Sequence, residues 1–331
     1  MSETLGVLAH RGGLVVDRPE LSVGVVHAVS RPTGLELELI ARRPLDSRSA
    51  AERQADIRAG RDARPSAPRR LLPQVDEGTN LRVGWLDRDG RAHWEYGSLS
   101  SSSGDHFEGV NGPSLRTVLR FPPMFDNMSI VLAWPEIGFP ETVVDLPLPD
   151  RSSVERNTVS IWDAPLDARR APDGLSHRVA VFPPTELAVE AGRVVAEPRV
   201  LSRHEHAVVV LNRLTAVGDA LSLEILAVAK EEEADAALAS VLPTSRYWPA
   251  DSDDPGQIRR RGPGASVAVV DERGAMWIQP YRSEATGGGS TFRATAEFAV
   301  TRPDHGILDL VAGWQIAGLA DMRSEIPLDG Q

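Results

Sequence analysis

The stretch "WPEIGFPETVVDLPLPD" at residues 134–150 returns near the end of the chain as "WQIAGLADMRSEIPLDG" at residues 314–330. Identical or similar residues stand at five matching places: Trp134 and Trp314, Gly138 and Gly318, Asp145 and Glu325, Pro147 and Pro327, and Leu148 and Leu328. A tryptophan, a turn glycine and a following proline in the same spacing predict the same local structure twice.

Three further matches precede this one in both halves of the chain. The matching pairs are "GGLVVDRPELS" (12–22) with "GRVVAEPRVLS" (192–202), "GLELELIAR" (34–42) with "ALSLEILAV" (220–228), and "LRVGWLDRDGRAHW" (81–94) with "ASVAVVDERGAMW" (265–277). All four keep their order at an offset of about 180 residues. A period this long indicates two whole domains, not a solenoid of small units.

The matched pieces have the pattern of β-strands. "LELELIA" alternates apolar and polar residues, which places Leu35, Leu37 and Leu39 on one face of a strand. "DRDG" (87–90) and "DERG" (271–274) each join two apolar runs, as short hairpin turns do. The sequence therefore predicts an all-β protein with two tandem antiparallel β-sandwich domains, and a barrel is the alternative.

The repeat also predicts the domain boundaries. The first repeat covers residues 1–150 with an insert at 44–78, and the second covers 191–331 with an insert at 231–264. Ser49 and Glu52 form a capping-box pattern that predicts a short helix in the first insert. "KEEEADAALASVLP" predicts a second helix, which ends before Pro243. Residues 151–190 form a connector whose strands either add to a sheet edge or pack between the domains.

Composition excludes several classes of function. The chain has 331 residues, a formal net charge of −11 and no cysteine, which excludes disulfides and thiolate metal sites. An acidic chain is not expected to bind nucleic acid or anionic membranes. The N-terminal residues lack a signal-peptide pattern, and no apolar run is long enough to span a membrane. We therefore expect a cytoplasmic protein with no nucleic-acid or membrane partner.

No motif predicts a complete catalytic or cofactor site. His204 and His206 are the candidates for a metal pair, because alternate residues of a strand point the same way, but no third ligand stands nearby. Asp105, His106 and Glu108 form a polar loop that lacks a nucleophile-elbow motif. The sequence therefore predicts no cofactor and no metal. The shared tryptophans, at 94 and 277 and at 134 and 314, are expected to fill the sandwich cores.

One segment resembles a known pattern. "FPPMFDNMSIVLAWPEIGFPETVVDLP" (121–147) is similar to a stretch of small uncharacterised actinobacterial proteins, where a Pro-Pro turn leads through an apolar strand to Trp-Pro and Gly-Ile-Pro-Glu. The resemblance covers about 30 residues, and the second repeat departs from it at Gln315 and Ala320. It implies no activity.

The function expected from these observations is non-enzymatic binding of a protein partner, or of a second copy of the chain. Duplicated domains suit bivalent contact. Tyr247 and Trp248, large aromatic residues among charges and prolines in the second insert, are the expected contact residues. One alternative is a hydrolase or carbohydrate-active protein with a site in one repeat. Another is a structural subunit that self-assembles through open sheet edges.

Overall fold

The computed structural model describes residues 3–44, 48–60, 66–73, 80–95, 99–103, 114–172, 175, 177–179, 192–241 and 264–329. The chain divides into two compact units. The N-terminal unit holds residues 7–157 and 189–191, and the C-terminal unit holds 1–6, 158–188 and 192–331. The sheets are almost entirely antiparallel and the helices are few, which confirms the all-β expectation. Among the described residues, no helix has both the length and the apolar character needed to cross a membrane.

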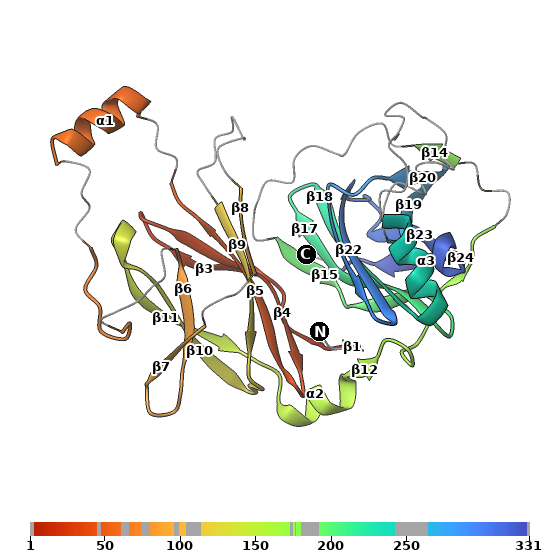
Figure 1. Ribbon diagram of the computed structural model, residues 1–331, viewed down its shortest axis with the longest axis horizontal. Helices are drawn as coiled ribbons and strands as arrows, with labels where there is room; N and C mark the ends of the chain where they lie inside the picture. Colours follow the sequence, from red (N-terminus) through yellow and green to blue (C-terminus); the bar gives the residue numbers. More distant parts are fainter. Residues whose placement is uncertain are drawn as a thin grey trace. The chain divides into compact units, whose positions relative to one another are not determined.

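The first sheet of the N-terminal unit has the strand order β2-β4-β5-β9-β8, with β3 also paired to β4 (Figure 1). Its strands are β2 (Val7–His10), β3 (Gly13–Asp17), β4 (Ser22–Arg31), β5 (Gly34–Arg42), β8 (Leu99–Ser103) and β9 (Ser114–Phe121). The alternation read from the sequence is confirmed here, because Leu35, Leu37 and Leu39 are all buried in the core of this unit.

The second sheet of the N-terminal unit has the order β11-β10-β6-β7. Its strands are β6 (Arg82–Leu86), β7 (Ala92–Glu95), β10 (Asn127–Trp134) and β11 (Phe139–Pro147), and the short 3-10 helix η1 (Pro135–Ile137) joins the last two. Ile130 and Leu132 from this sheet meet the leucines of β5 in one hydrophobic cluster. The unit is therefore a two-sheet sandwich with one core.

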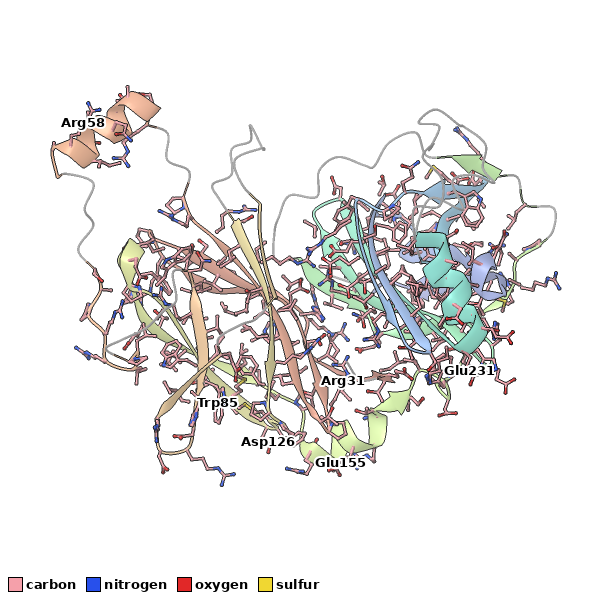
Figure 2. The ribbon with its side chains drawn as sticks, viewed as in Figure 1. Arg31, Arg58, Trp85, Asp126, Glu155 and Glu231 are labelled. Atoms are coloured by element: carbon pink, nitrogen blue, oxygen red, sulfur yellow. The ribbon has the colours of Figure 1, made fainter. Side chains whose placement is uncertain are left out.

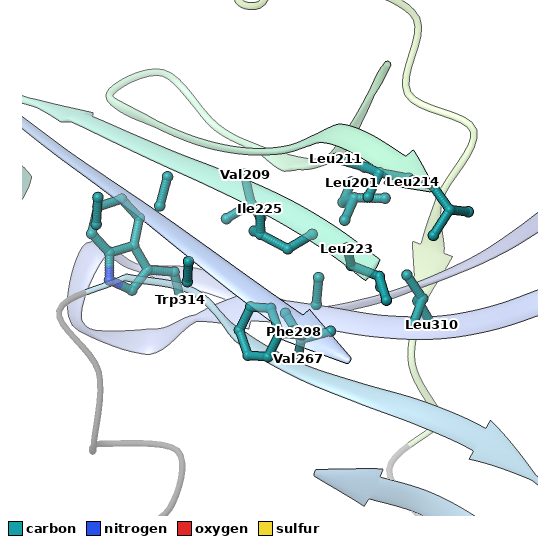
Figure 3. Packing of buried hydrophobic residues seen from close by; sticks show 14 of the residues in the cluster. Leu201, Val209, Leu211, Leu214, Leu223, Ile225, Val267, Phe298, Leu310 and Trp314 are labelled. Atoms are coloured by element: carbon teal, nitrogen blue, oxygen red, sulfur yellow. The ribbon is translucent and has the colours of Figure 1, made fainter. Parts of the chain in front are cut away.

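The C-terminal unit repeats the first sheet strand for strand. Its order is β15-β17-β18-β22-β21, with β16 also paired to β17. The strands are β15 (Arg193–Ala196), β16 (Arg199–Arg203), β17 (Ala207–Val217), β18 (Ala220–Lys230), β21 (Arg282–Gly288) and β22 (Thr291–Thr301). Figure 3 shows Leu223 and Ile225 of β18 packed with Phe298 of β22 and Trp314 of the second sheet. Apolar residues from both sheets therefore share one core.

The second sheet of the C-terminal unit is larger than its counterpart. Its order is β13-β24-β23-β19-β20-β14. The strands are β13 (Arg169–Arg170), β14 (His177–Val179), β19 (Ser266–Asp271), β20 (Gly274–Ile278), β23 (Ile307–Trp314) and β24 (Leu319–Pro327), with η2 (Gln315–Ala317) between the last two. The central four strands correspond to β11-β10-β6-β7. Two connector strands, β13 and β14, extend this sheet at its two edges.

The segments that opened the sequence analysis have the same register. Asn127 pairs with Pro147, and Ile307 pairs with Pro327, so each β10–β11 pair has its equivalent 180 positions later in β23–β24. Both hairpins shift register just before the tryptophan. Gly138 and Gly318 take left-handed φ angles of 81° and 72°, which glycine adopts without strain. The repeated sequence thus folds into repeated structure, and descent from one duplicated domain stays a prediction.

The connector is divided between the two units. Helix α2 (Arg151–Asn157) belongs to the N-terminal unit, whereas residues 158–188 belong to the C-terminal unit. Strand β12 (Val159–Ser160) pairs with β1 (Thr4–Leu5) from the start of the chain. Ile161 and Ala164 cover apolar residues of β16, β17 and β18. The connector therefore completes the C-terminal unit instead of standing apart from both repeats.

Both predicted insert helices are present. Helix α1 (Ala50–Arg58) begins with the expected capping box, in which Ser49 and Glu52 bond each other's backbone N–H groups. Helix α3 (Glu231–Val241) follows β18 directly and buries Ala234 and Ala237. Of the two inserts, residues 45–47, 61–65, 74–78 and 242–263 lie outside the described residues.

Candidate interaction site on the second sheet

The residues singled out in the sequence do not form a site together. Tyr247 and Trp248, the expected contact residues, lie outside the described residues, as does the polar loop with Asp105, His106 and Glu108. Their role as contacts stays a prediction.

His204 and His206 make structural contacts. The Nε2 of His204 lies 2.8 Å from the carbonyl oxygen of Ala317, and its Nδ1 accepts the N–H of His206 at 3.1 Å. This network assigns the proton to Nε2 and leaves neither ring nitrogen of His204 for an ion. The His206 ring lies 3.6 Å from Glu231. Among the described residues, no three metal-binding side chains come together.

A buried pair of a basic side chain and a glutamate stands at equivalent places in the two units. His27 on β4 faces Glu38 on β5 at 3.0 Å, and Arg213 on β17 faces Glu224 on β18 at 3.1 Å. Each basic residue follows a register shift in its strand. Sequence reasoning missed these pairs because a bulge breaks the period-two pattern that would reveal them. Each glutamate already has its basic partner within the same unit, which favours a structural role.

The shared tryptophans divide into two kinds. Trp134 and Trp314 fill the two cores, as expected. Trp94 and Trp277 instead lie on the opposite face of the second sheet, since Trp94 pairs with Gly84 and the core-facing residue of β6 is its neighbour Val83. The expectation that all four tryptophans fill the cores was wrong. Side chains alternate between the two faces of a strand, and the tryptophans of β7 and β20 stand at positions that face away from the core.

Each of these outer tryptophans is covered by a different segment. In the C-terminal unit, Ala171 and Leu175 of the connector pack on Trp277, which is 1% exposed. In the N-terminal unit, the end of the first insert takes this place, and the Nε1 of Trp94 donates to the carbonyl oxygen of Leu71 at 3.2 Å. Equivalent tryptophans are therefore covered by the connector in the C-terminal unit and by the first insert in the N-terminal unit.

Glu141 on β11 fixes the insert segment. Its carboxylate accepts the backbone N–H groups of three successive residues, Arg70, Leu71 and Leu72, at 2.7–3.0 Å. Consecutive N–H groups that converge on one carboxylate form a strong anion-binding arrangement. Leu72 is buried as a result. The outer face of this sheet is thus closed where residues 66–73 lie.

A second ion pair supports the same region. Arg82 is 4% exposed, and its guanidinium donates to both carboxylate oxygens of Glu136 at 2.6 and 2.7 Å. Arg69 reaches the same carboxylate at 3.1 Å. The hydrogen bonds from Arg82 lower the pKa of Glu136 below its ordinary value, although partial burial opposes this shift. Glu136 therefore stays ionised well into the acidic range.

The edges of the second sheet differ between the units. In the C-terminal unit, β13 adds to β24 in antiparallel orientation, with Arg169 opposite Arg323 and Arg170 opposite Met322. The N–H of Ala171 donates to the carbonyl oxygen of Asp321 at 2.9 Å. At the other edge, β14 adds to β20 in parallel orientation. Connector strands therefore extend both edges of this sheet.

The corresponding edges of the N-terminal unit are β11 and β7. Within the described residues, no strand pairs with the outer side of either one. By the alternation of an antiparallel ladder, the residues equivalent to Asp321 and Arg323, which are Glu141 and Val143, turn their backbone N–H and C=O groups toward the edge. The side chain of Val143 is 47% exposed, unusually open for a valine in a sheet.

An aromatic pair stands beside the β7 edge. The rings of Trp85 and His93 stack at a centroid distance of 4.3 Å (Figure 2 shows Trp85), and the Nε2 of His93 lies 2.8 Å from Asp87. This contact and two backbone N–H groups lower the pKa of Asp87. The predicted turn role of Asp87 is confirmed, since its Oδ1 accepts from Asp89 and Arg91. Sequence reasoning missed His93, which the period-two spacing across the hairpin could have revealed.

Comparisons with known proteins add no functional assignment. No family model matches the chain, and no curated protein matches it. A crystal structure of a conserved domain protein from Bacillus anthracis is 10% identical, with 92% of this chain and 77% of that chain covered, at a TM-score of 0.21. Bovine butyrophilin is 8% identical, with 91% and 93% covered, at a TM-score of 0.20. At these scores neither likeness carries an argument.

Proposed function

We propose that this chain is a non-enzymatic protein-binding protein, and that the second sheet of its N-terminal unit accepts an extended segment of the partner as an added strand. One observation carries the proposal: the C-terminal unit adds strands at both edges of this sheet, and the described residues leave the same edges open in the N-terminal unit. A sheet edge with unpaired N–H and C=O groups is a template for another strand.

The physical basis of such binding is the backbone. Each residue of an added strand exchanges hydrogen bonds with the edge, and side chains on alternate positions supply specificity. The internal strands β13 and β14 support the proposal, because two edges of the same architecture already hold short segments this way. No nucleic acid, membrane or cofactor enters the proposal.

Site-specific photo-crosslinking in cells tests this function. A photoreactive amino acid is placed at Val143 on β11, at His93 on β7, and at Arg323 on β24, which is the equivalent of Val143 on an occupied edge. We expect protein adducts from Val143 or His93 and none from Arg323. Adducts at Val143 that contain only this chain would support self-association through the edge instead. Equal adducts at all three positions, or none at any, would reject the proposal.

The aromatic pair of the second insert belongs to the same proposal. Tyr247 and Trp248 are proposed to contact the partner beside the added strand, since large aromatic residues often anchor interfaces. Replacing both with alanine should weaken capture of the partner identified by crosslinking. Unchanged capture would remove these two residues from the interface.

The proposal places the protein in the cytoplasm. The composition without cysteine supports this location. Fractionation of native cells, with the chain detected by antibody, checks it.

A further inference from the structure

We infer that the edge of β11 takes a basic extended segment in antiparallel orientation, with an arginine of that segment on Asp145. The inference rests on the proposed function, because it names the occupant of one of the two open edges. It is argued from the internal strand β13, the charge of the β11 edge and the residues that differ between β11 and β24.

The pairing of β13 with β24 supplies the template. Arg169 stands opposite Arg323 on β24 and reaches along the strand to Glu325, with Nη2 and Oε1 2.5 Å apart. Both side chains are largely exposed, at 65% and 53%. An acidic residue two positions along the edge strand therefore orients an arginine of the added strand. The contact is diagonal, which long side chains in antiparallel sheets can span.

The β11 edge keeps the acidic residue of this template. Asp145 is the equivalent of Glu325, and the hydroxyl of Ser129 donates to its Oδ1 at 2.5 Å. The register pairs Ser129 with Asp145 on the outer face of the sheet, away from the core. The carboxylate thus has a fixed position beside the open edge and remains accessible.

The β11 edge lacks the basic residue of the template. Arg323 occupies the place opposite Arg169 and pairs with Asp309 across the sheet. Its equivalent on β11 is the exposed Val143, and the equivalent of Asp309 is Ser129. An arginine of the incoming segment therefore lies opposite the apolar side chain of Val143 and not opposite another positive charge. The same segment is expected to fit β11 with less electrostatic repulsion than β24.

Charge also decides against self-pairing. Two copies of β11 that paired antiparallel about Val143 would place Glu141 of one copy opposite Asp145 of the other. Two such acid–acid contacts would form, one on each side of the symmetry axis. Like charges directly opposite in a ladder are destabilising. Asp145 is the carboxylate of this edge that remains accessible, since Glu141 already binds residues 70–72, and an acidic, apolar edge is therefore better matched by a basic segment than by itself.

The test uses the full-length protein and a synthetic peptide with the sequence of residues 164–172, "APLDARRAP". Peptide is titrated to about 5 mM while backbone amide signals are followed by NMR, so that even a Kd in the millimolar range is detected. We expect the amides of Val143 and Asp145 to shift. A peptide with both arginines replaced by glutamate should give no shift at these positions.

Variants of the protein test whether the carboxylate of Asp145 binds the arginine of the peptide. Asp145→Arg should weaken binding roughly tenfold, and the milder Asp145→Asn should weaken it by a factor of about three. Glu155→Arg is the matched control, because Glu155 is an exposed acid on α2 of the same unit (Figure 2), and it should leave the Kd unchanged. Unperturbed amide spectra outside β11 verify that the variants fold.

Three results would overturn the inference. They are no shift at saturating peptide, shifts confined to β7, and binding that ignores both Asp145 substitutions. If crosslinks form at Val143 in cells while the basic peptide fails to bind, the occupant is wrong and the proposed function stands. If neither occurs at either edge, both are wrong. A dimer linked through β11 would also contradict the charge argument.

Discussion

Glu141 shows how one side chain can fix a segment distant in sequence. Its carboxylate accepts three successive backbone N–H groups that would otherwise lack a hydrogen-bond partner against the sheet. The negative charge strengthens each of these hydrogen bonds. The insert end then covers Trp94. The contact of Glu141 therefore covers the outer face of the sheet and leaves the edge of β11 open.

Glu141→Gln should therefore release residues 70–72. The amide retains one accepting oxygen and loses the charge, so we expect a local cost of about 1–2 kcal/mol. Amide hydrogen exchange of Leu71 and Leu72 should accelerate by about five- to thirtyfold. Glu155→Gln serves as the control and should change neither rate. Unchanged protection of Leu71 in the Glu141 variant would contradict this role.

Glu136 gives the N-terminal unit a dependence on pH. Hydrogen bonds from Arg82 lower its pKa in the folded state, so its contribution is complete above the ordinary carboxyl pKa. That contribution is lost as the pH falls through the lowered folded pKa. Because Glu136 is 40% exposed, we expect it to contribute only about 1–2 kcal/mol at pH 7.

The comparison of wild type with Glu136→Gln checks this sign. Unfolding of the N-terminal unit by urea should differ between the two proteins by about 1–2 kcal/mol at pH 7 and pH 6. The difference should shrink toward zero as the pH falls through the lowered pKa of Glu136, where the wild-type carboxylate takes up its proton. A difference that stays constant down to pH 2.5 would show that charge is not its cause.

Local sequence rules predicted some residues and missed others for definite reasons. The capping box at Ser49 and the turn role of Asp87 depend on neighbours within four positions, so the sequence contains the whole cause. His204 was considered as a metal ligand because its hydrogen-bond partner in the structure, the carbonyl oxygen of Ala317, is 113 positions away and could not be recognised from the sequence. A contact of that range leaves no periodic trace in the sequence.

The strand β13 is the element that closes the β24 edge. Two paired residues and the N–H of Ala171 hold it there. An element this short has little intrinsic stability, so its place depends on each hydrogen bond. Alternation predicted long strands such as β5, whereas strands of two or three residues are too short for a period to be recognised. The sequence left open whether connector strands add to a sheet edge or pack between the domains, and in the structure β13 and β14 add to sheet edges.

Ala171→Pro should open this second edge. Proline removes the N–H that bonds Asp321, and the loss of about 1 kcal/mol should accelerate amide exchange of Arg323 about fivefold. The basic peptide should then bind at two places instead of one. Ala171→Gly retains the N–H and is the matched control, for which one site is expected. A single site in both variants would show that β13 does not control access to β24.

For the whole molecule, the two units share an architecture and differ in what completes it. Their strand orders and the registers of the β10–β11 and β23–β24 hairpins agree, as the repeat of 134–150 in 314–330 predicted. The match of 12–22 with 192–202 was wrong, because β3 pairs with the start of β4 whereas β15 pairs with the end of β17. The difference at the sheet edges was not predictable, because it depends on which unit receives residues 158–188. A site defined by missing strand partners has no motif of its own, and sequence reasoning therefore turned to Tyr247, Trp248 and the histidines.

Residue-level hydrogen exchange on the unmodified chain tests the central claim most directly. Val143 and Arg323 are equivalent residues whose N–H groups face the β11 and β24 edges, whereas the N–H groups of Val144 and Ser324 face the neighbouring strands β10 and β23. The amide of Val143 should exchange at least about tenfold faster than that of Arg323, while Val144 and Ser324 are protected to a similar degree. Adding the basic peptide should then slow Val143 alone. Equal protection of Val143 and Arg323 in the free protein would mean that the β11 edge is already occupied, and it would contradict the account.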